Sequence, residues 1–525
     1  MAALARQQQR PLRVGLFADS VRQPRWLAES LARVANSGFA EIAVLAVSSA
    51  SPARAPMLWN GYGRLDRFLF GGPDPLESVP IDRLVAPTRR IDFTPADRGW
   101  RTHVAGFGLD VALTLGAFDT PLDDLARFGE WRYAFGKTGI ARAELAALPE
   151  LVEGSPVVSS ALRIRRNGEG RVACRSWSRT VPFSIARSHD RLFATSAEFL
   201  ERGLKRVHEE GEGWLARQAL VEPHDERSPG LAHCLRGIAA LGGNVARRTA
   251  ESCFTVGQWS LAFSFGDSPW SGNLQGFHRL VPPPDRFWAD PFPIEAKGRH
   301  YIFFEELPFS TGKGHISVVE VHRDGRASMP QVVLERDHHL SYPFLLQHEG
   351  RLYMIPESAY AGTVEAWRCE EFPRRWRRER VLLEGRFLAD ATLHPHGGRW
   401  WMFANAGSEQ GGADDELHVF HANDPLHDWQ PHRDNPVKSD VRSSRPAGRL
   451  FFENGVLHRP AQVCAPLYGS GIAMNRVTQL TTTEFAEEEL RRIEPDAASG
   501  LLGTHTINRA GDLFVTDVFA RRRRF

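Results

Sequence analysis

The hydrophobic pattern of the second half of the chain repeats five times. Each copy has an apolar, β-rich run, then a turn that contains glycine, then a second run rich in aromatic or aliphatic residues. Equivalent points of the copies are Asp290, Pro343, Asp390, Pro446 and His505. Their spacing of about 50 residues, with one strand-turn-strand unit per copy, is typical of β-propeller blades. The pattern therefore predicts an all-β, five-bladed β-propeller over residues 275–525.

The first part of the chain has the alternating pattern of an α/β domain. Residues 12–17 and 41–47 are apolar and rich in β-forming residues, and the apolar positions between them recur at helical spacing. Residues 109–116 predict another strand, and residues 122–128 predict a short helix. We expect an α/β domain over residues 10–180.

The region between these two parts is predicted to be helical. Ala197–Glu210 and Leu231–Leu241 carry the clearest helical periodicity, and Gly211 marks the end of the first helix. Prolines at 282–284 form a stiff entry to the propeller. We therefore expect a mainly helical connector over residues 181–274, which places the start of the propeller at residue 275.

Length and charge narrow the class of protein. At 525 residues the chain is too long for a single core. Its formal charge of +2 creates no strong field toward nucleic acid, which we do not expect as a partner. No apolar run is long enough for a transmembrane segment, and residues 1–13 lack the apolar core of a signal peptide. The expected location is the cytoplasm.

Cysteine and histidine spacing gives no sign of a metal cofactor. The five cysteines are widely spaced and form no Cys-x-x-Cys pair, which argues against a disulfide framework and a zinc site. Histidines are frequent between residues 338 and 432, but none has a recognisable metal-ligand spacing. We expect no metal centre, and a structural Ca²⁺ or Na⁺ on the propeller axis stays open. The cysteines are Cys174, Cys234, Cys253, Cys369 and Cys464.

Several short phrases lie in order along the predicted propeller. They are FWADPF at 287–292, HLSYPF at 339–344, YMIPES at 353–358, DAT at 390–392, DNP at 434–436, RPAG at 445–448 and RPAQ at 459–462. Together they resemble the N-terminal domain of plant glucosamine inositolphosphorylceramide transferases and its bacterial relatives. That domain is similar to the five-bladed propellers of arabinanases, levansucrases and invertases. The resemblance covers residues 255–520 and implies a propeller that handles sugars.

The α/β part resembles a formyltransferase-type domain. The residues that carry this resemblance are Arg13–Phe17, Leu109–Gly116 and Ala126–Trp131. Formyltransferases of this type carry an Asn-x-His pair and a later Asp in the active site. The stretch Arg132–Gly136 contains no His, so the resemblance implies a degenerate domain, and folate is not an expected cofactor.

Three acidic residues are the candidates for catalysis. Asp290 and Asp390 stand at matching points of the first and third repeats, and Glu357 ends the second strand of its repeat. Two carboxyl groups across a pocket are what glycosidic chemistry needs. The resemblance implies that Asp290 is the base or nucleophile. We assign Glu357 as the general acid and Asp390 as the residue that tunes a pKa or anchors the sugar. The alternative is that both aspartates only cap turns.

A second set of polar residues is predicted to line the same pocket. Arginine forks suit carboxylate or phosphate groups, and Gln and His suit sugar hydroxyls, so an anionic sugar or a nucleotide-sugar is the expected ligand. Hydrogen bonding between blades is the alternative for Arg459 and Gln462. Trp288, Tyr342, Trp367, Trp400 and Trp401 are candidates for sugar stacking or for core packing. The substrate-binding candidates are His339, Arg445, Arg459, Gln462 and His505.

The leading interpretation is a carbohydrate-active enzyme. It would be a transferase or a glycosidase-like hydrolase that acts on a sugar or glycoconjugate in cell-surface glycan, polysaccharide or glycolipid synthesis. In the plant relatives sugar transfer is assigned to a separate C-terminal glycosyltransferase domain. One alternative is therefore a non-catalytic propeller that binds a glycan and positions it for partner enzymes of glycan biosynthesis. Another is formyl or acyl transfer to an amino sugar by the α/β domain.

Overall fold

The chain divides into two compact units, Met1–Arg248 and Thr249–Phe525. The computed structural model describes residues 10–49, 55–84, 89–94, 97, 99–116, 121–221, 229–266, 274, 276–408 and 412–524. Within these described ranges, no helix combines the length and the apolar character that crossing a bilayer requires.

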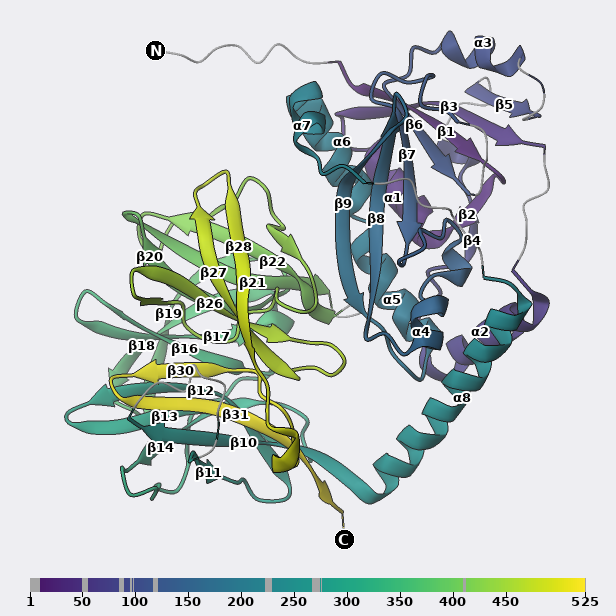
Figure 1. The fold of residues 1–525 in the computed structure, drawn as a ribbon. Helices are drawn as coiled ribbons and strands as arrows, with labels where there is room; N and C mark the ends of the chain where they lie inside the picture. The colour runs from purple at the N-terminus through teal and green to yellow at the C-terminus, as the bar shows by residue number, and fades with distance from the viewer. Residues whose placement is uncertain are drawn as a thin grey trace, which may run out of the picture. The chain divides into compact units, whose positions relative to one another are not determined.

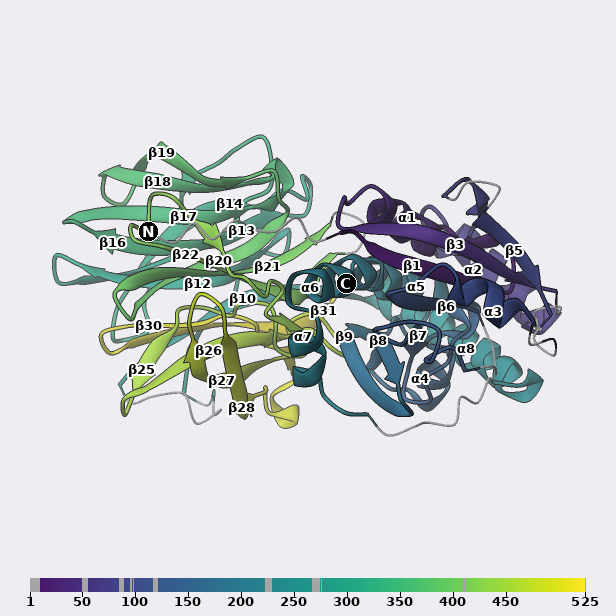
Figure 2. The ribbon, with the colours of Figure 1, turned by 90° about the horizontal axis from the view of Figure 1, so that it is seen from above.

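The first unit is built on a seven-stranded mixed sheet (Figure 1). In spatial order its strands are β5 (Arg90–Phe93), β3 (Ala40–Ser48), β1 (Leu12–Ala18), β6 (Val111–Leu115), β7 (Glu130–Phe135), β8 (Val157–Arg166) and β9 (Glu169–Arg179). The first five are parallel, and β8 and β9 are antiparallel additions (Figure 2). After β1 the chain continues to one side of the sheet, and after β6 to the other. The strand order therefore reverses between β1 and β6, a position that often binds ligands.

Three of the helices present an apolar face to this sheet. In α1 (Arg25–Ala35), Trp26, Leu27, Leu31 and Val34 are buried, as the helical spacing predicts. α5 (Ile185–Ser196) and α6 (Phe199–Glu210) bury their apolar residues in the same core. The other elements are β2 (Arg22–Pro24), α2 (Met57–Phe70), β4 (Ser78–Pro80), α3 (Gly99–Ala105), α4 (Leu148–Glu153), α7 (Glu212–Arg217) and α8 (Leu231–Phe254).

Two expectations for this unit differ from the structure. Residues 122–128 form no helix. The Phe128 N–H donates to the Asp110 carbonyl at 2.7 Å, so this segment lies alongside the residues that lead into β6 instead. Residues 181–274 also do not form a separate helical connector. α5 and α6 share the core of the sheet, since their apolar faces cover it. These helices are therefore part of the α/β unit.

The second unit is a five-bladed β-propeller, as the sequence repeat predicts. In four of its blades the strands follow one another along the chain. They are β12 (Arg286–Ala296), β13 (Arg299–Pro308), β14 (His315–Val321) and β15 (Gln331–Leu334); β16 (Ser341–His348), β17 (Arg351–Ser358), β18 (Thr363–Glu371) and β19 (Arg375–Glu384); β20 (Leu388–His396), β21 (Arg399–Ser408), β22 (Gly412–Ala422), β23 (Gln430–Pro431) and β24 (Lys438–Ser439); β25 (Phe451–Glu453), β26 (Val456–Val463), β27 (Gly471–Leu480) and β28 (Phe485–Ile493).

The fifth blade joins the two ends of this unit. Its strands are β30 (Ile507–Ala510), β31 (Leu513–Arg523), β10 (Thr255–Phe265) and β11 (His278–Leu280), and β29 (Leu501–Gly503) also pairs with β31. β10 and β31 pair from Thr255 opposite Arg523 to Phe265 opposite Leu513. The expected start of the propeller at residue 275 is therefore too late, because β10 is a strand of the fifth blade.

The innermost strands of the first three blades share a kink at matching positions. Asp290, Tyr342 and Asp390 have φ values of 52°, 43° and 55°, and the strand register shifts at each of them. Positive φ is uncommon for residues other than glycine, and a β-bulge of this kind re-aims a side chain. Tyr342, and not Pro343, is therefore the equivalent of the two aspartates.

Candidate functional site

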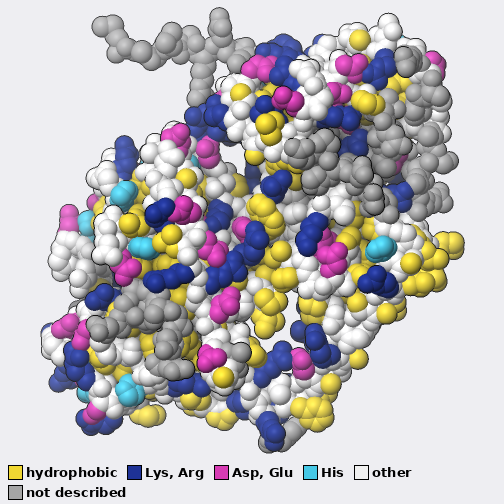
Figure 3. Space-filling model, in the orientation of Figure 1, with side chains coloured by type: hydrophobic (Ala, Val, Ile, Leu, Met, Phe, Trp, Pro, Cys, Tyr) yellow, Lys and Arg dark blue, Asp and Glu magenta, His cyan; other side chains and the backbone are white. Residues whose placement is uncertain are grey.

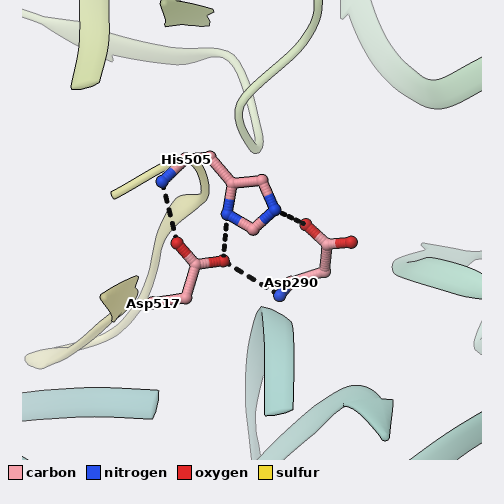
Figure 4. Close-up of side chains that lie close together, drawn as sticks. All are labelled: Asp290, His505 and Asp517. Carbon is pink, nitrogen blue, oxygen red and sulfur yellow. Dashed lines mark hydrogen bonds and ion pairs between the residues drawn. The ribbon is translucent and has the colours of Figure 1, made fainter. Parts of the chain in front are cut away.

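Asp290, His505 and Asp517 form a buried cluster, here called the imidazole cluster (Figure 4). His505 Nδ1 lies 2.6 Å from Asp517 Oδ2, and His505 Nε2 lies 3.6 Å from Asp290 Oδ1. The Asp290 N–H donates to Asp517 Oδ2 at 3.0 Å. The imidazole thus lies between a carboxylate of the first blade and one of the fifth.

Neighbouring groups fix the orientation of His505. Asp517 Oδ1 accepts hydrogen bonds from the backbone N–H groups of His505 and Thr506, at 2.8 and 3.1 Å. The Thr506 hydroxyl donates to Asp290 Oδ1 at 2.6 Å. Trp259 stacks on the imidazole with ring centroids 4.1 Å apart. Since every side of the ring has a partner, its position is set by the fold.

The imidazole cluster holds a positive charge between two acids. Burial raises the pKa of Asp290 to about 6, although the charge of His505 opposes this rise. Burial alone would lower the pKa of His505, but the charges of Asp517 and Asp290 outweigh it and raise that pKa. At neutral pH the cluster therefore favours an ionised Asp290 beside an imidazolium.

Glu357, Asp390 and Arg445 form a second cluster, here called the guanidinium cluster. Arg445 Nε donates to Asp390 Oδ2 at 2.6 Å, and Arg445 Nη2 donates to Glu357 Oε2 at 3.3 Å. Gln462 Nε2 also donates to Asp390 Oδ2, at 2.8 Å. One guanidinium from the fourth blade therefore connects acids of the second and third blades.

One acid of the guanidinium cluster has a strongly raised pKa. Burial, followed by the charge of Asp390, raises the pKa of Glu357 well above its usual range, and Arg445 opposes this. Burial also raises the pKa of Glu305, and the charges of Asp290 and Glu357 add to the rise. A carboxyl group that keeps its proton at neutral pH can act as a general acid. The upward shift of the Glu357 pKa is the direction that this role requires.

Tyr468 separates the two clusters. Its ring centroid lies 5.1 Å from Arg445 Cζ and 5.3 Å from the His505 ring centroid. Asp390 and Asp290 are close enough that the charge of Asp390 raises the pKa of Asp290. The two clusters are therefore neighbours, one aromatic ring apart.

The second strand of every blade adds a buried polar side chain at a matching level. In each of the first three blades, the residue that carries this side chain pairs with the residue just before the kink of the innermost strand. In the other two, their N–H groups bond to Arg445 and Thr506 carbonyls. The amide of Asn405 has no hydrogen-bond partner among the described residues, unlike most buried polar groups. The set is Glu305, Glu357, Asn405, Gln462 and Asp517.

Most of the predicted site residues come together. Six of them, from four different blades and the loop before β30, form or touch the two clusters: Asp290, Glu357, Asp390, Arg445, Gln462 and His505. Arg459 does not. Its guanidinium is fully buried and bonds both oxygens of Glu487 at 2.7 Å, together with the carbonyls of Ser443 and Ser444. The ion pair with Glu487 lies within the fourth blade, whereas the alternative interpretation for Arg459 was hydrogen bonding between blades.

His339 lies at the edge of the site. Its Nδ1 accepts from the Gly314 N–H at 3.0 Å, and its Nε2 lies 3.3 Å from Glu305 Oε1. Burial, with the charge of Arg445, lowers the pKa of His339 to about 4. The ring is therefore neutral at pH 7. Next to it lies Tyr360, 59% exposed, with ring centroids 6.1 Å apart.

The aromatic residues that the sequence offered for sugar stacking are core residues. Four are buried in hydrophobic clusters and Trp400 packs partly against one. Tyr342 has a further role, because its hydroxyl lies 2.8 Å from Thr392 Oγ1 and accepts from the Gly448 N–H at 2.7 Å. It pins three blades together where the first and third blades have an acid. The four buried residues are Trp288, Tyr342, Trp367 and Trp401.

Sequence reasoning missed Asp517, Trp259, Tyr468 and Tyr360. A signal for Asp517 exists, since it follows the apolar run Leu513–Val515 much as Glu305 follows Tyr301–Phe304. Comparing the ends of the second strands would have found it. Trp259 gives no such signal, because it lies in β10, at the opposite end of the propeller sequence.

The imidazole cluster is also where a cation would find donors. Its three side chains offer one ligand atom each within 4.8 Å of one another. Ca²⁺ prefers about six to eight oxygen ligands, whereas one of these donors is a nitrogen. Protonated His505 already supplies a positive charge to both aspartates. The absence of a metal centre stays a prediction, and a structural Ca²⁺ or Na⁺ on the propeller axis stays open.

A separate cavity of about 370 Å³ lies in the α/β unit. It lies at the carboxyl ends of β1 and β6, where the strand order reverses, and Asp19, Arg142 and Glu144 line it. Gly116, with a φ of 107°, lets Asp19 approach, because a Cβ there would lie 2.3 Å from Asp19 Oδ2. Burial raises the pKa of both carboxyl groups, and the charge of Arg142 opposes the rise. The formyltransferase-like character of this unit stays a prediction.

Comparison with known proteins concerns the propeller. Residues 280–499 match the family model described as glucosamine inositolphosphorylceramide transferase 1, N-terminal. The transferase of that name from Oryza sativa subsp. japonica is 34% identical over 208 residues, which cover 39% of this chain and 28% of the relative. The one from Arabidopsis thaliana is 30% identical over 263 residues, which cover 45% of this chain and 34% of the relative.

Solved structures of similar fold include two glycosidases. Zg3597, a family 117 glycoside hydrolase from Zobellia galactanivorans, is 14% identical with a TM-score of 0.32, over 50% of this chain and 90% of that one. RS223-β-xylosidase is 12% identical with a TM-score of 0.35, over 45% and 93%. The chain spans 28–34% of the length of the curated relatives named above. Residues 280–499 are thus similar to the N-terminal domain of plant glucosamine inositolphosphorylceramide transferases.

Proposed function

We propose that the propeller acts on a sugar or glycoconjugate of cell-surface glycan or glycolipid synthesis, as a transferase or a glycosidase-like hydrolase. Glu357 is the general acid, Asp290 is the base or nucleophile, and Asp390 anchors the sugar and tunes the pKa of Glu357. The transferase name of the relatives similar to residues 280–499 supports a role in sugar chemistry.

The observation that carries the proposal is a pair of buried carboxyl groups held by different cations, Asp290 beside His505 and Glu357 beside Arg445. A pKa of about 6 leaves Asp290 mostly ionised at pH 7, whereas burial and Asp390 hold the pKa of Glu357 well above its usual range. Glycosidic bond chemistry needs this division, because one carboxyl group protonates the leaving oxygen while the other activates the acceptor or attacks carbon.

The cations beside these acids suit the proton movements. When Glu357 gives up its proton, the Arg445 Nη2 group at 3.3 Å stabilises the new carboxylate. His505 holds Asp290 ionised before the reaction and is itself oriented by Asp517. Arg445 and His505 are therefore positioning residues, and neither needs to contact the sugar.

Two further groups are placed to bind the sugar. His339 is not one of them, because its ring nitrogens already contact the Gly314 N–H and Glu305 Oε1. The exposed ring of Tyr360 can stack on an apolar sugar face. The unpartnered amide of Asn405 offers one donor group and one acceptor to a polar guest.

Calorimetry with nucleotide-sugars, uronic acids and amino sugars tests the proposal, with product analysis in the same samples. Asp290→Asn is the informative variant, because Asn keeps the shape of the side chain and tolerates a φ of 52°. Asp428→Asn is the matched control, an exposed aspartate with a φ of 54°. We expect Asp290→Asn to retain sugar binding and to lose turnover by about 10²–10⁴-fold.

The other outcomes separate the alternatives. Saturable binding without any turnover by the wild type would instead make the propeller a glycan-binding unit that positions substrate for partner enzymes. Absence of binding across the panel, or equal turnover by Asp290→Asn and wild type, would overturn the assignment of the site.

The α/β unit supports a second candidate function, group transfer to an amino sugar. The cavity beside Asp19 and Glu144 is the observation that favours it, since carboxyl groups of raised pKa can accept a proton from an amine near neutral pH. Titration of the protein with folates and amino sugars, repeated with Asp19→Asn, tests this function. Binding of these ligands that Asp19→Asn leaves unchanged would contradict it.

A further inference from the structure

Two helices of the α/β unit expose large apolar side chains. In α2, Met57 is 90% exposed and Phe68 is 84% exposed. Figure 3 shows hydrophobic side chains gathered where Figure 1 places α2 and α8. Seven exposed residues, here called the apolar face, are Met57, Leu58, Leu65, Phe68 and Leu69 of α2 and Leu231 and Leu235 of α8.

The apolar face of α2 is not the face that packs on the core. Trp59 and Asp66 are buried on the other side of the helix, as expected at about 3.6 residues per turn. Trp59 Nε1 donates to the Glu144 carbonyl at 2.8 Å, and Asp66 Oδ2 accepts from Ser184 Oγ at 2.8 Å. The helix is thus fixed to the unit by one face and turns its large aliphatic residues outward, the reverse of an ordinary surface helix.

α8 lies against α2. A Cβ at Gly237 would lie 3.3 Å from the Trp59 ring, so the two helices meet at this glycine. Cys234 and Leu241 of α8 are buried as well. The exposed leucines of α8 therefore extend the apolar surface that α2 begins.

The exposed charges of α2, and of α8 up to residue 248, have one sign. Every exposed charged side chain there is an arginine, and the single acid, Asp66, is buried. Two partly exposed acids, Asp74 after α2 and Glu251 near the end of α8, are each paired with an arginine. Arg64 and Arg236 have no ion-pair partner among the described residues. Exposed apolar side chains next to unpaired arginines match the chemistry of an anionic membrane surface.

We propose that the apolar face docks on the surface of an anionic lipid bilayer. The Leu, Met and Phe side chains enter the boundary of the acyl chains, and Arg64 and Arg236 contact lipid phosphates. The surface is distinct from the axial site of the propeller, and the inference does not depend on the function of that site.

Co-sedimentation of the full chain with lipid vesicles tests the proposal. The vesicles contain phosphatidylcholine alone or with phosphatidylglycerol, at low and high salt. The variant Leu58→Gln/Leu65→Gln/Phe68→Gln changes the apolar face, and Met329→Gln/Val332→Gln/Phe452→Gln is the matched control on exposed apolar residues of the propeller. We expect wild type and control to bind phosphatidylglycerol vesicles, and the first variant to lose about tenfold or more in partition coefficient.

A second variant and two further measurements cover the other occupants of this surface. Arg64→Gln/Arg236→Gln is expected to reduce the preference for phosphatidylglycerol and its salt dependence. The proposal is overturned when the wild type does not bind vesicles, or when the apolar-face variant binds as well as the wild type. A dimer that this variant dissociates in light scattering would assign the face to a second copy. If the wild type does not bind vesicles and the apolar-face variant has a lower melting temperature than the wild type, the apolar face would be assigned to contacts within the chain.

Discussion

The imidazole cluster and the guanidinium cluster are built alike but hold their protons differently. Each places one cation among buried carboxyl groups, two around His505 and three around Arg445, whose Nη1 also lies 3.7 Å from Asp414 Oδ1. The cation of the first is an imidazole, which can lose its charge near neutral pH, and that of the second is a guanidinium, which cannot. The shorter contact of Arg445 goes to Asp390, at 2.6 Å, and Glu357 receives only a 3.3 Å bond. The two clusters therefore differ in how closely the cation holds each acid.

Removal of the guanidinium should have the largest effect on stability. Arg445→Met leaves Asp390 and Glu357 buried without a cation, so we expect the free energy of unfolding to fall by about 3–5 kcal/mol. Urea unfolding at pH 7 measures this change. Arg445→Lys keeps the charge without the fork and should lose less. A loss below about 1 kcal/mol for Arg445→Met would show that Asp390 and Glu357 do not depend on Arg445.

Removal of the imidazole charge should change the pH profile of activity mainly by raising the pKa of Asp290. In His505→Gln the charge that lowers the pKa of Asp290 is gone, so this pKa rises further above about 6. We expect the acidic limb of the pH profile of kcat/KM to move to higher pH, and the free energy of unfolding to fall by about 1.5–3 kcal/mol. An unmoved acidic limb would mean that His505 is uncharged in the folded protein.

The raised pKa of Asp290 predicts a pH-dependent stability. The pKa is about 6 in the folded protein against an ordinary value of 3.8, so the folded state binds this proton more tightly. The contribution of Asp290 to stability therefore falls as pH rises from about 4 to about 6 and is constant above that range. Urea unfolding across this range should show a difference between wild type and Asp290→Asn that changes by about 1–3 kcal/mol. A difference that does not vary with pH would contradict the assignment.

Of these substitutions, Tyr342→Phe should cause the smallest loss of stability and should leave activity unchanged. Tyr342→Phe removes the hydroxyl that contacts Thr392 and Gly448, and we expect the free energy of unfolding to fall by about 1–2 kcal/mol. Because Tyr342 pins blades and is not an acid of either cluster, turnover per folded molecule should stay at the wild-type level. Thermal unfolding and activity measured on one preparation check both statements, and a loss of turnover would assign Tyr342 to the chemistry.

The repeat made the propeller and most of its site predictable, and its limits show at two arginines. Arg445 and Arg459 both begin the tripeptide Arg-Pro-Ala. Arg445 faces the acids of the axis, whereas Arg459 lies on the second strand and is fully buried against Glu487. Identical local sequence gives identical expectations. Only the position of the strand within the blade separates the two roles.

Long-range pairing explains the other differences. β10 was assigned to a helical connector because its partner, β31, begins only at Leu513. Local periodicity carries no information about a partner so distant in sequence. In the α/β unit, residues 12–17 and 41–47 were predicted correctly because parallel buried strands are continuous apolar runs.

The pairing of β10 with β31 also determines when the propeller can close during synthesis. The strands of the α/β unit lie between Leu12 and Arg179, so that unit can fold while the ribosome is still making the propeller. The fifth blade cannot form until Arg523 has emerged, and until then β10 presents an open edge to whatever strand it meets. A ribosome that stalls within the last blade would therefore release a chain with a folded first half and an unclosed ring.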